Sequence, residues 1–114
     1  MSAPPKWVPN IQKELAQARS ARLAGNEGMA RVCARRAAGI AIGVYLEDQG
    51  LPLPGPSAYD RLKYFGNLPG VTPQQAEICS QLTLRVNQEF NLPIDIDLIE
   101  QARILINDLL EINE

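Results

Sequence analysis

Four arginines are the residues of this sequence that point most clearly to ligand binding. Arg31, Arg35 and Arg36 lie close together, and Arg22 precedes them. Guanidinium groups bind phosphate oxygens through paired hydrogen bonds, so these four predict a phosphate, nucleotide or RNA-backbone contact. The alternative is a solvated seam in which the arginines pair with carboxylates such as Glu27. No aromatic residues interleave with the arginines, which argues against base stacking on a single strand.

Other kinds of chemistry find little support. The sequence has no histidine, which excludes Ser-His-Asp and Cys-His catalysis and metal sites that contain histidine. Asp95 and Asp97 could bind a metal or serve as acid and base, but Asp97 with Glu100 has the spacing of a helix cap. Cys33 and Cys79 fall on apolar helix faces and are interpreted as buried, reduced thiols. We therefore expect no catalytic residue, no cofactor and no metal ligand.

The element that must position the arginines is a long helix over residues 26–49. A lone surface helix needs an apolar stripe only about 100° wide, whereas apolar and small residues fill about half of this helical wheel. They are Met29, Ala30, Cys33, Ala34, Ala37, Ile40, Ala41, Val44 and Tyr45. The helix is therefore predicted to be central and covered on more than one side.

Three further long helices are predicted over residues 9–24, 72–90 and 96–112, the last beginning at either Ile96 or Leu98, with a short one over 57–67. Gly25 ends the first helix, and Asn26, Ser57 and Thr72 are expected to cap those that follow. The fold class is therefore all-α, an up-down-up-down four-helix bundle with one short extra helix between the second and third long helices. A single domain spans residues 1–114, of which 1–8 form a flexible N-terminal tail.

Several residues are candidates for a contact with another protein. Gly39 and Gly43 each cost about 1 kcal/mol in a helix relative to alanine, which predicts close approach by another helix of the same chain or of a second subunit. Apolar residues off the core faces suggest a patch for a partner. The candidate interface consists of Val32, Gly39, Ile42, Gly43, Leu46, Leu84 and Ile104. The aromatic residues Tyr59, Tyr64 and Phe65 of the short helix are expected to cover the end of the bundle, and a small pocket beside Tyr45 and the proline-rich loop is the alternative.

Composition narrows the class of protein. The net charge is −2, so no global basic field attracts nucleic acid or acidic membranes. No apolar run approaches the roughly 20 residues of a membrane-spanning helix, and the N-terminus does not resemble a secretory signal. We therefore expect a cytoplasmic protein.

The overall pattern resembles the HEPN-type four-helix bundles found with minimal nucleotidyltransferases. The resemblance rests on the small-residue second helix with CARRAAG and the YL that follows, on the insert SAYDRL and on the closing DLIEQARILINDLL. It implies dimerisation, and binding of nucleotides or of a partner enzyme. The ribonuclease branch of that family carries an arginine followed after four to six residues by histidine, so its motif is absent and a non-nuclease member is implied.

Two functions remain open at this stage. The leading one is a non-catalytic interaction or accessory module, homodimeric or paired with a nucleotidyltransferase-like protein. The alternative is a nucleotide- or RNA-binding module that uses the arginines. An enzyme that relies on carboxylates or tyrosine alone is a third and less favoured hypothesis.

Overall fold

The computed structural model describes residues 5–84 and 96–111. Within these ranges the chain forms helices and no strand, so the predicted all-α class is confirmed. The helices are α1 (Trp7–Leu23), α2 (Glu27–Asp48), α3 (Ala58–Gly66), α4 (Pro73–Leu82) and α5 (Leu98–Leu110). None of the helices in these ranges is long and apolar enough to cross a membrane.

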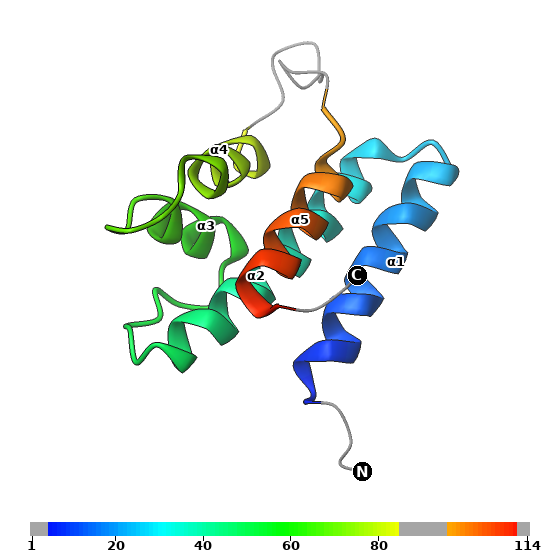
Figure 1. Ribbon diagram of the computed structural model, residues 1–114. Helices are drawn as coiled ribbons and strands as arrows, with labels where there is room; N and C mark the ends of the chain where they lie inside the picture. The colour runs from blue at the N-terminus through cyan, green and yellow to red at the C-terminus, as the bar shows by residue number, and fades with distance from the viewer. Residues whose placement is uncertain (1–4, 85–95, 112–114) are drawn as a thin grey trace.

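Helix α2 lies at the centre of the molecule. It contacts α1, α3, α4 and α5, and Figure 1 shows α5 in front of it, with α1 on one side and α3 and α4 on the other. Its buried residues are Ala30, Cys33, Ala34, Ala37, Ala38, Gly39, Ala41, Ile42, Gly43 and Leu46. They surround most of the helix because neighbours cover it from several directions. The prediction of one central helix between Asn26 and Gln49 is confirmed.

Local capping signals in the sequence define where the helices begin. The side chains of Asn26 and Ser57 each accept a hydrogen bond from the backbone amide three residues later. Thr72 and Gln75 form a reciprocal capping box, with distances of 3.1 and 3.0 Å. Gly25 takes a φ of 79° between α1 and α2, a conformation that costs glycine little. These predictions are confirmed.

Helix α4 ends at Leu82, earlier than the sequence predicts. The Thr83 hydroxyl donates to the carbonyls of Cys79 and Ser80, at 2.8 and 3.1 Å. The Leu82 carbonyl accepts a hydrogen bond of 2.8 Å from Nε of Arg35. The Cys79 carbonyl also accepts the Thr83 amide, and the side-chain donors provide partners for the carbonyls of Ser80 and Leu82 at the end of the helix. Thr83 and Leu84 are described and are not helical, and residues 85–90 of the predicted helix lie outside the described residues.

The outer ends of the first and last helices also differ from expectation. Helix α1 begins at Trp7, so Trp7 and Val8 belong to a helix and not to the predicted tail. Helix α5 ends at Leu110, with Glu111 in the left-handed conformation. The predicted end at Ile112, like residues 1–4, lies outside the described part of the chain.

The two interior glycines of α2 pack within the chain. A Cβ placed on Gly39 would lie 2.7 Å from Cβ and 2.9 Å from Cα of Ala58, in the first turn of α3. A Cβ on Gly43 would lie 2.5 Å from Nη1 of Arg61. The absence of side chains at these positions therefore lets α3 approach α2 closely.

Four of the seven candidate interface residues are buried in this chain. Gly39, Ile42, Gly43 and Leu46 belong to the core of α2. For the two glycines the close neighbour is α3 of the same chain, which is one of the two alternatives that the sequence left open. Ile42 and Leu46 are fully buried and so do not lie on an exposed patch. A helical wheel assigns one inner face, whereas α2 is covered on several. The remaining three candidates, Val32, Leu84 and Ile104, are partly buried and stay predictions.

Candidate functional site

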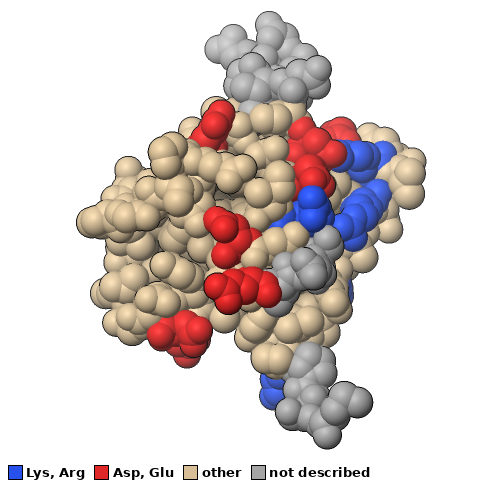
Figure 2. All heavy atoms as spheres, in the orientation of Figure 1, with Lys and Arg blue, Asp and Glu red and all other residues tan. Residues whose placement is uncertain are grey.

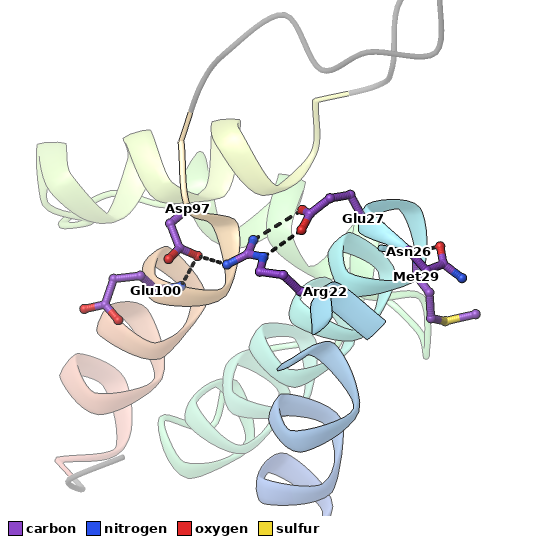
Figure 3. Close-up of polar contacts among 6 residues, drawn as sticks. All are labelled: Arg22, Asn26, Glu27, Met29, Asp97 and Glu100. Atoms are coloured by element: carbon purple, nitrogen blue, oxygen red, sulfur yellow. Dashed lines mark hydrogen bonds and ion pairs between the residues drawn. The ribbon is translucent and has the colours of Figure 1, made fainter. Parts of the chain in front are cut away.

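The predicted phosphate-binding arginines separate into different environments. Arg22 lies between two carboxylates (Figure 3): its Nε is 2.7 Å from Oε1 of Glu27, and its Nη1 is 2.7 Å from Oδ1 of Asp97. The bonds to Glu27, and then those to Asp97, raise the pKa of Arg22 above its ordinary value. Arg22, near the end of α1, therefore forms ion pairs with residues at the start of α2 and of α5.

Asp97 also caps α5, as the sequence predicts. Its Oδ1 accepts a hydrogen bond of 3.1 Å from the Glu100 amide. The Glu100 side chain does not complete a capping box but pairs with Arg103. Burial alone would raise the pKa of Asp97, but the hydrogen bonds from Arg22 and from the Glu100 amide lower it overall. Asp95, the other candidate carboxylate, lies outside the described residues.

A cavity of about 540 Å³ gathers arginines from two different helices. Its lining comes from α1, from the outer side of α2, and from the loop and first turn of α3. The residues are Glu14, Val32, Arg35, Arg36, Gly39, Ile40, Pro56, Ser57, Ala58, Tyr59 and Arg61. We call this cavity the arginine pocket. Of the four predicted arginines it contains Arg35 and Arg36, whereas Arg22 and Arg31 are not among its lining residues.

Arg61 is a lining residue that the sequence did not single out. Its Nε donates to the Gly55 carbonyl at 2.7 Å, and its Nη1 donates to the Gly39 carbonyl at 3.1 Å. Gly43 leaves room for this guanidinium against α2. The same glycine that permits helix packing therefore also places a positive charge in the pocket wall.

The pocket has an excess of positive charge. Three arginines line it against the single carboxylate of Glu14, and the first turn of α3 adds the positive end of a helix dipole. Arg36 is exposed, and it forms no hydrogen bond or ion pair with the described part of the chain. An anion that enters the pocket therefore meets at least one guanidinium that is not occupied within the described structure.

The described residues hold neither a cluster of metal ligands nor an activated thiol. They include no group of three or more histidine, cysteine or carboxylate residues that could hold a metal ion. Cys33 and Cys79 are buried, and burial raises the pKa of Cys79 to about 12. Burial, followed by the negative charge of Glu14, also raises the pKa of Cys33. At neutral pH neither thiol is therefore in the thiolate form that acts as a nucleophile.

A second hollow of about 360 Å³ lies at the far end of α2. Tyr45 and Phe65 form an edge-to-face pair there, with ring centroids 5.6 Å apart. The other lining residues are Leu51, Leu68, Pro69, Gly70, Val71 and Gln75. The hollow lies beside Tyr45 and Leu51, where the sequence left a small pocket open as an alternative, and Phe65 of the short helix is part of its wall. Leu51 is 39% exposed and Leu53, in the same loop, is 46% exposed.

Comparisons with known proteins add no identification. No family model, no curated protein and no solved structure matches this chain. The interpretation of the site therefore depends on its own geometry and charge.

Proposed function

We propose that this chain is a non-catalytic binding module that holds a small phosphate-bearing molecule, of nucleotide size, in the arginine pocket. The observation that carries this proposal is the convergence of Arg35, Arg36 and Arg61 on one cavity of about 540 Å³. Pockets for small molecules span roughly 300–1,000 Å³ and combine apolar walls with a few charged groups. Val32, Ile40 and Pro56 supply apolar wall, and the guanidinium groups supply the charge.

A small ligand fits this molecule better than a long RNA strand. The net charge is −2, whereas RNA-binding domains present a broad basic surface. On the face shown in Figure 2, acidic side chains are scattered over the helices and basic ones gather on the side of α1. The positive charge of the arginine pocket is instead concentrated in a concave site, which suits a compact anion.

The proposed fold family is consistent with this function. We propose that the helices belong to an up-down-up-down four-helix bundle of the HEPN type, with α3 as the extra helix. What supports this is the helix order, the central α2 and the missing nuclease motif. In that setting the module would act as an accessory subunit of a nucleotidyltransferase-like protein, and it would retain a ligand rather than transform one.

Calorimetric titration with ribose 5-phosphate and with adenosine monophosphate tests the proposal. Arg36→Gln should weaken both by about tenfold or more, because a charge-assisted hydrogen bond contributes about 1.5–3 kcal/mol. Arg36 is the better target, since Arg35 also caps the end of α4. Affinity should fall with added salt.

The matched control is Arg31→Gln, which removes the same charge from the same helix outside the pocket lining. It should leave both affinities within about twofold of the unaltered protein, allowing for screened long-range charge. No binding by the unaltered protein, or equal losses in the two variants, would overturn the proposal.

Exposed apolar residues favour a second candidate function, which is contact with another protein. Leu23 is 89% exposed and Met29 is 45% exposed near the turn between α1 and α2, while Leu51 and Leu53 project beside the Tyr45 hollow. Clusters of exposed apolar side chains often mark interaction sites. A second copy of this chain is the partner to test first.

Light scattering over a range of protein concentrations tests this candidate. A dimer that dissociates in Leu53→Ser but not in Leu23→Ser would place the contact at the proline-rich loop, and the reverse would place it at the turn between α1 and α2. A strict monomer at high micromolar concentration would rule out the homodimer.

A further inference from the structure

Glu14 is the only carboxylate among the residues that line the arginine pocket. Its Oε2 is buried and has no hydrogen-bond partner among the described residues. Buried polar atoms are nearly always hydrogen-bonded, and a buried acceptor that lacks a donor costs free energy. The Cys33 thiol lies close enough to Glu14 for the carboxylate to raise its pKa, but a thiol is only a weak donor. The carboxylate therefore has the capacity to accept a stronger hydrogen bond from a ligand in the cavity.

The neighbouring arginines do not supply that donor. Two donors of Arg61 are directed to the Gly55 and Gly39 carbonyls, and Nε of Arg35 is directed to Leu82. Arg36 is exposed. The pocket thus offers a ligand two unlike groups, guanidinium donors for an anion and a carboxylate acceptor for an N–H group.

We propose that the ligand is a nucleotide whose base carries an amino group, and that Glu14 accepts a hydrogen bond from this amino group while the arginines hold the phosphate. This inference rests on the proposed function and adds the identity of the ligand's other end. An ionised carboxylate only accepts hydrogen bonds, so it favours an amino substituent and disfavours a carbonyl oxygen at the same position. Inorganic phosphate and sugar phosphates carry no amino group, so they cannot make this contact.

A pair of ligands that differ only in the amino group tests the inference. Adenosine monophosphate and purine riboside 5′-monophosphate share phosphate, sugar and ring, but the second lacks the amino group. The unaltered protein should bind adenosine monophosphate about tenfold or more tightly, because the hydrogen bond is charge-assisted. Equal affinities of the two nucleotides would overturn the inference.

The Glu14→Leu variant then assigns the preference to this residue. Removal of the negative charge should tighten phosphate binding in general, so the informative quantity is the ratio of the two affinities and not either value alone. The ratio should fall to about one in Glu14→Leu and to an intermediate value in Glu14→Gln, whose neutral amide oxygen still accepts. A ratio that persists in Glu14→Leu would contradict the proposed contact. Should Glu14→Leu fail to fold, the affinity ratio of the two nucleotides in the unaltered protein and in Glu14→Gln still tests the contact.

Ribose 5-phosphate separates this inference from the function on which it rests. If it binds and loses affinity in Arg36→Gln while the two nucleotides bind equally, the pocket is an anion site and Glu14 does not recognise the base. If neither it nor any nucleotide binds, the proposed function itself fails.

Discussion

Gly39 lies where α2 and α3 come closest, and a single added methyl group tests that contact. In Gly39→Ala the new Cβ would lie 2.7 Å from Cβ and 2.9 Å from Cα of Ala58, so the backbone of α3 must move. Overpacking of this kind costs about 1–3 kcal/mol. We expect a lower midpoint of thermal unfolding, measured by circular dichroism, together with a distorted arginine pocket, because Gly39 and Ala58 both line it.

Gly28→Ala is the matched control for this substitution. It adds the same methyl group to the same helix, but the nearest atom to the new Cβ would be Oδ1 of Asn26 at 3.7 Å. Both variants gain helix propensity of up to about 1 kcal/mol, so the difference between them measures the contact with Ala58. Equal unfolding midpoints would mean that α2 and α3 are not in close contact in solution.

The residues that sequence reasoning missed are those whose partners are distant along the chain. Caps at Asn26 and Thr72 were predictable because donor and acceptor lie three residues apart. Arg22 meets Asp97 across 75 positions, and Arg35 meets Leu82 across 47. Nothing in the spacing of arginines reveals that these two guanidinium groups are used within the fold. Gly39 and Gly43 were the feature of the sequence that could have pointed to Arg61. A helix face without side chains leaves room for a side chain of a neighbouring helix.

At the scale of elements, Asp97 connects the start of α5 to the turn between α1 and α2 through Arg22 (Figure 3). Two substitutions separate its two roles. Asn is as good a helix cap as Asp, so Asp97→Asn should remove only the ion pair and cost up to about 1 kcal/mol, as partly exposed pairs do. Asp97→Ala should cost about a further 0.5–2 kcal/mol from the lost cap. Urea unfolding at neutral pH measures both. Equal losses would show that the cap contributes nothing.

The pH dependence of stability gives an independent measurement of the same ion pair. The pKa of Asp97 is lower in the folded protein than its ordinary value of 3.8. A group with a lowered pKa stabilises the fold above its ordinary pKa, and this contribution is lost as the pH falls through the folded value. The free energy of unfolding should therefore decrease less steeply below about pH 4 in Asp97→Asn than in the unaltered protein. The lowered pKa of Glu100, caused mainly by Arg103, acts in both proteins, but the negative charge of Asp97 raises it, so Asp97→Asn also lowers the Glu100 pKa somewhat further.

At the scale of the whole molecule, the all-helical class followed from periodicity, but the surroundings of each helix did not. The wheel of α2 correctly indicated coverage on more than one side, yet Ile42 and Leu46 were assigned to a partner surface although both are fully buried. A wheel records which residues share a face and not which neighbour covers that face. The arginine pocket was likewise only half predictable, because it forms where α1, α2 and α3 meet.

The two buried thiols allow a test of whether these helices unfold as one unit. Cys33 lies in the central α2 and Cys79 in the peripheral α4, and both are buried. Since α2 contacts all four other helices, we expect Cys33→Ala and Cys79→Ala, each with one remaining thiol, to be labelled only through global unfolding. Labelling by a thiol reagent in increasing urea should then follow each variant's own loss of helical circular dichroism.

A different result would change the description of the molecule. Suppose that Cys79 reacts at a urea concentration where the helical signal is largely retained, while Cys33 remains protected. Then α4 would open independently of α1 and α2, as low-stability units do in other proteins. Because Nε of Arg35 bonds the Leu82 carbonyl at the end of α4, such opening would remove one hydrogen-bond partner from a guanidinium that lines the arginine pocket. Ligand binding would then couple to the position of α4, and added adenosine monophosphate should shift the urea dependence of Cys79 labelling without a matching shift for Cys33.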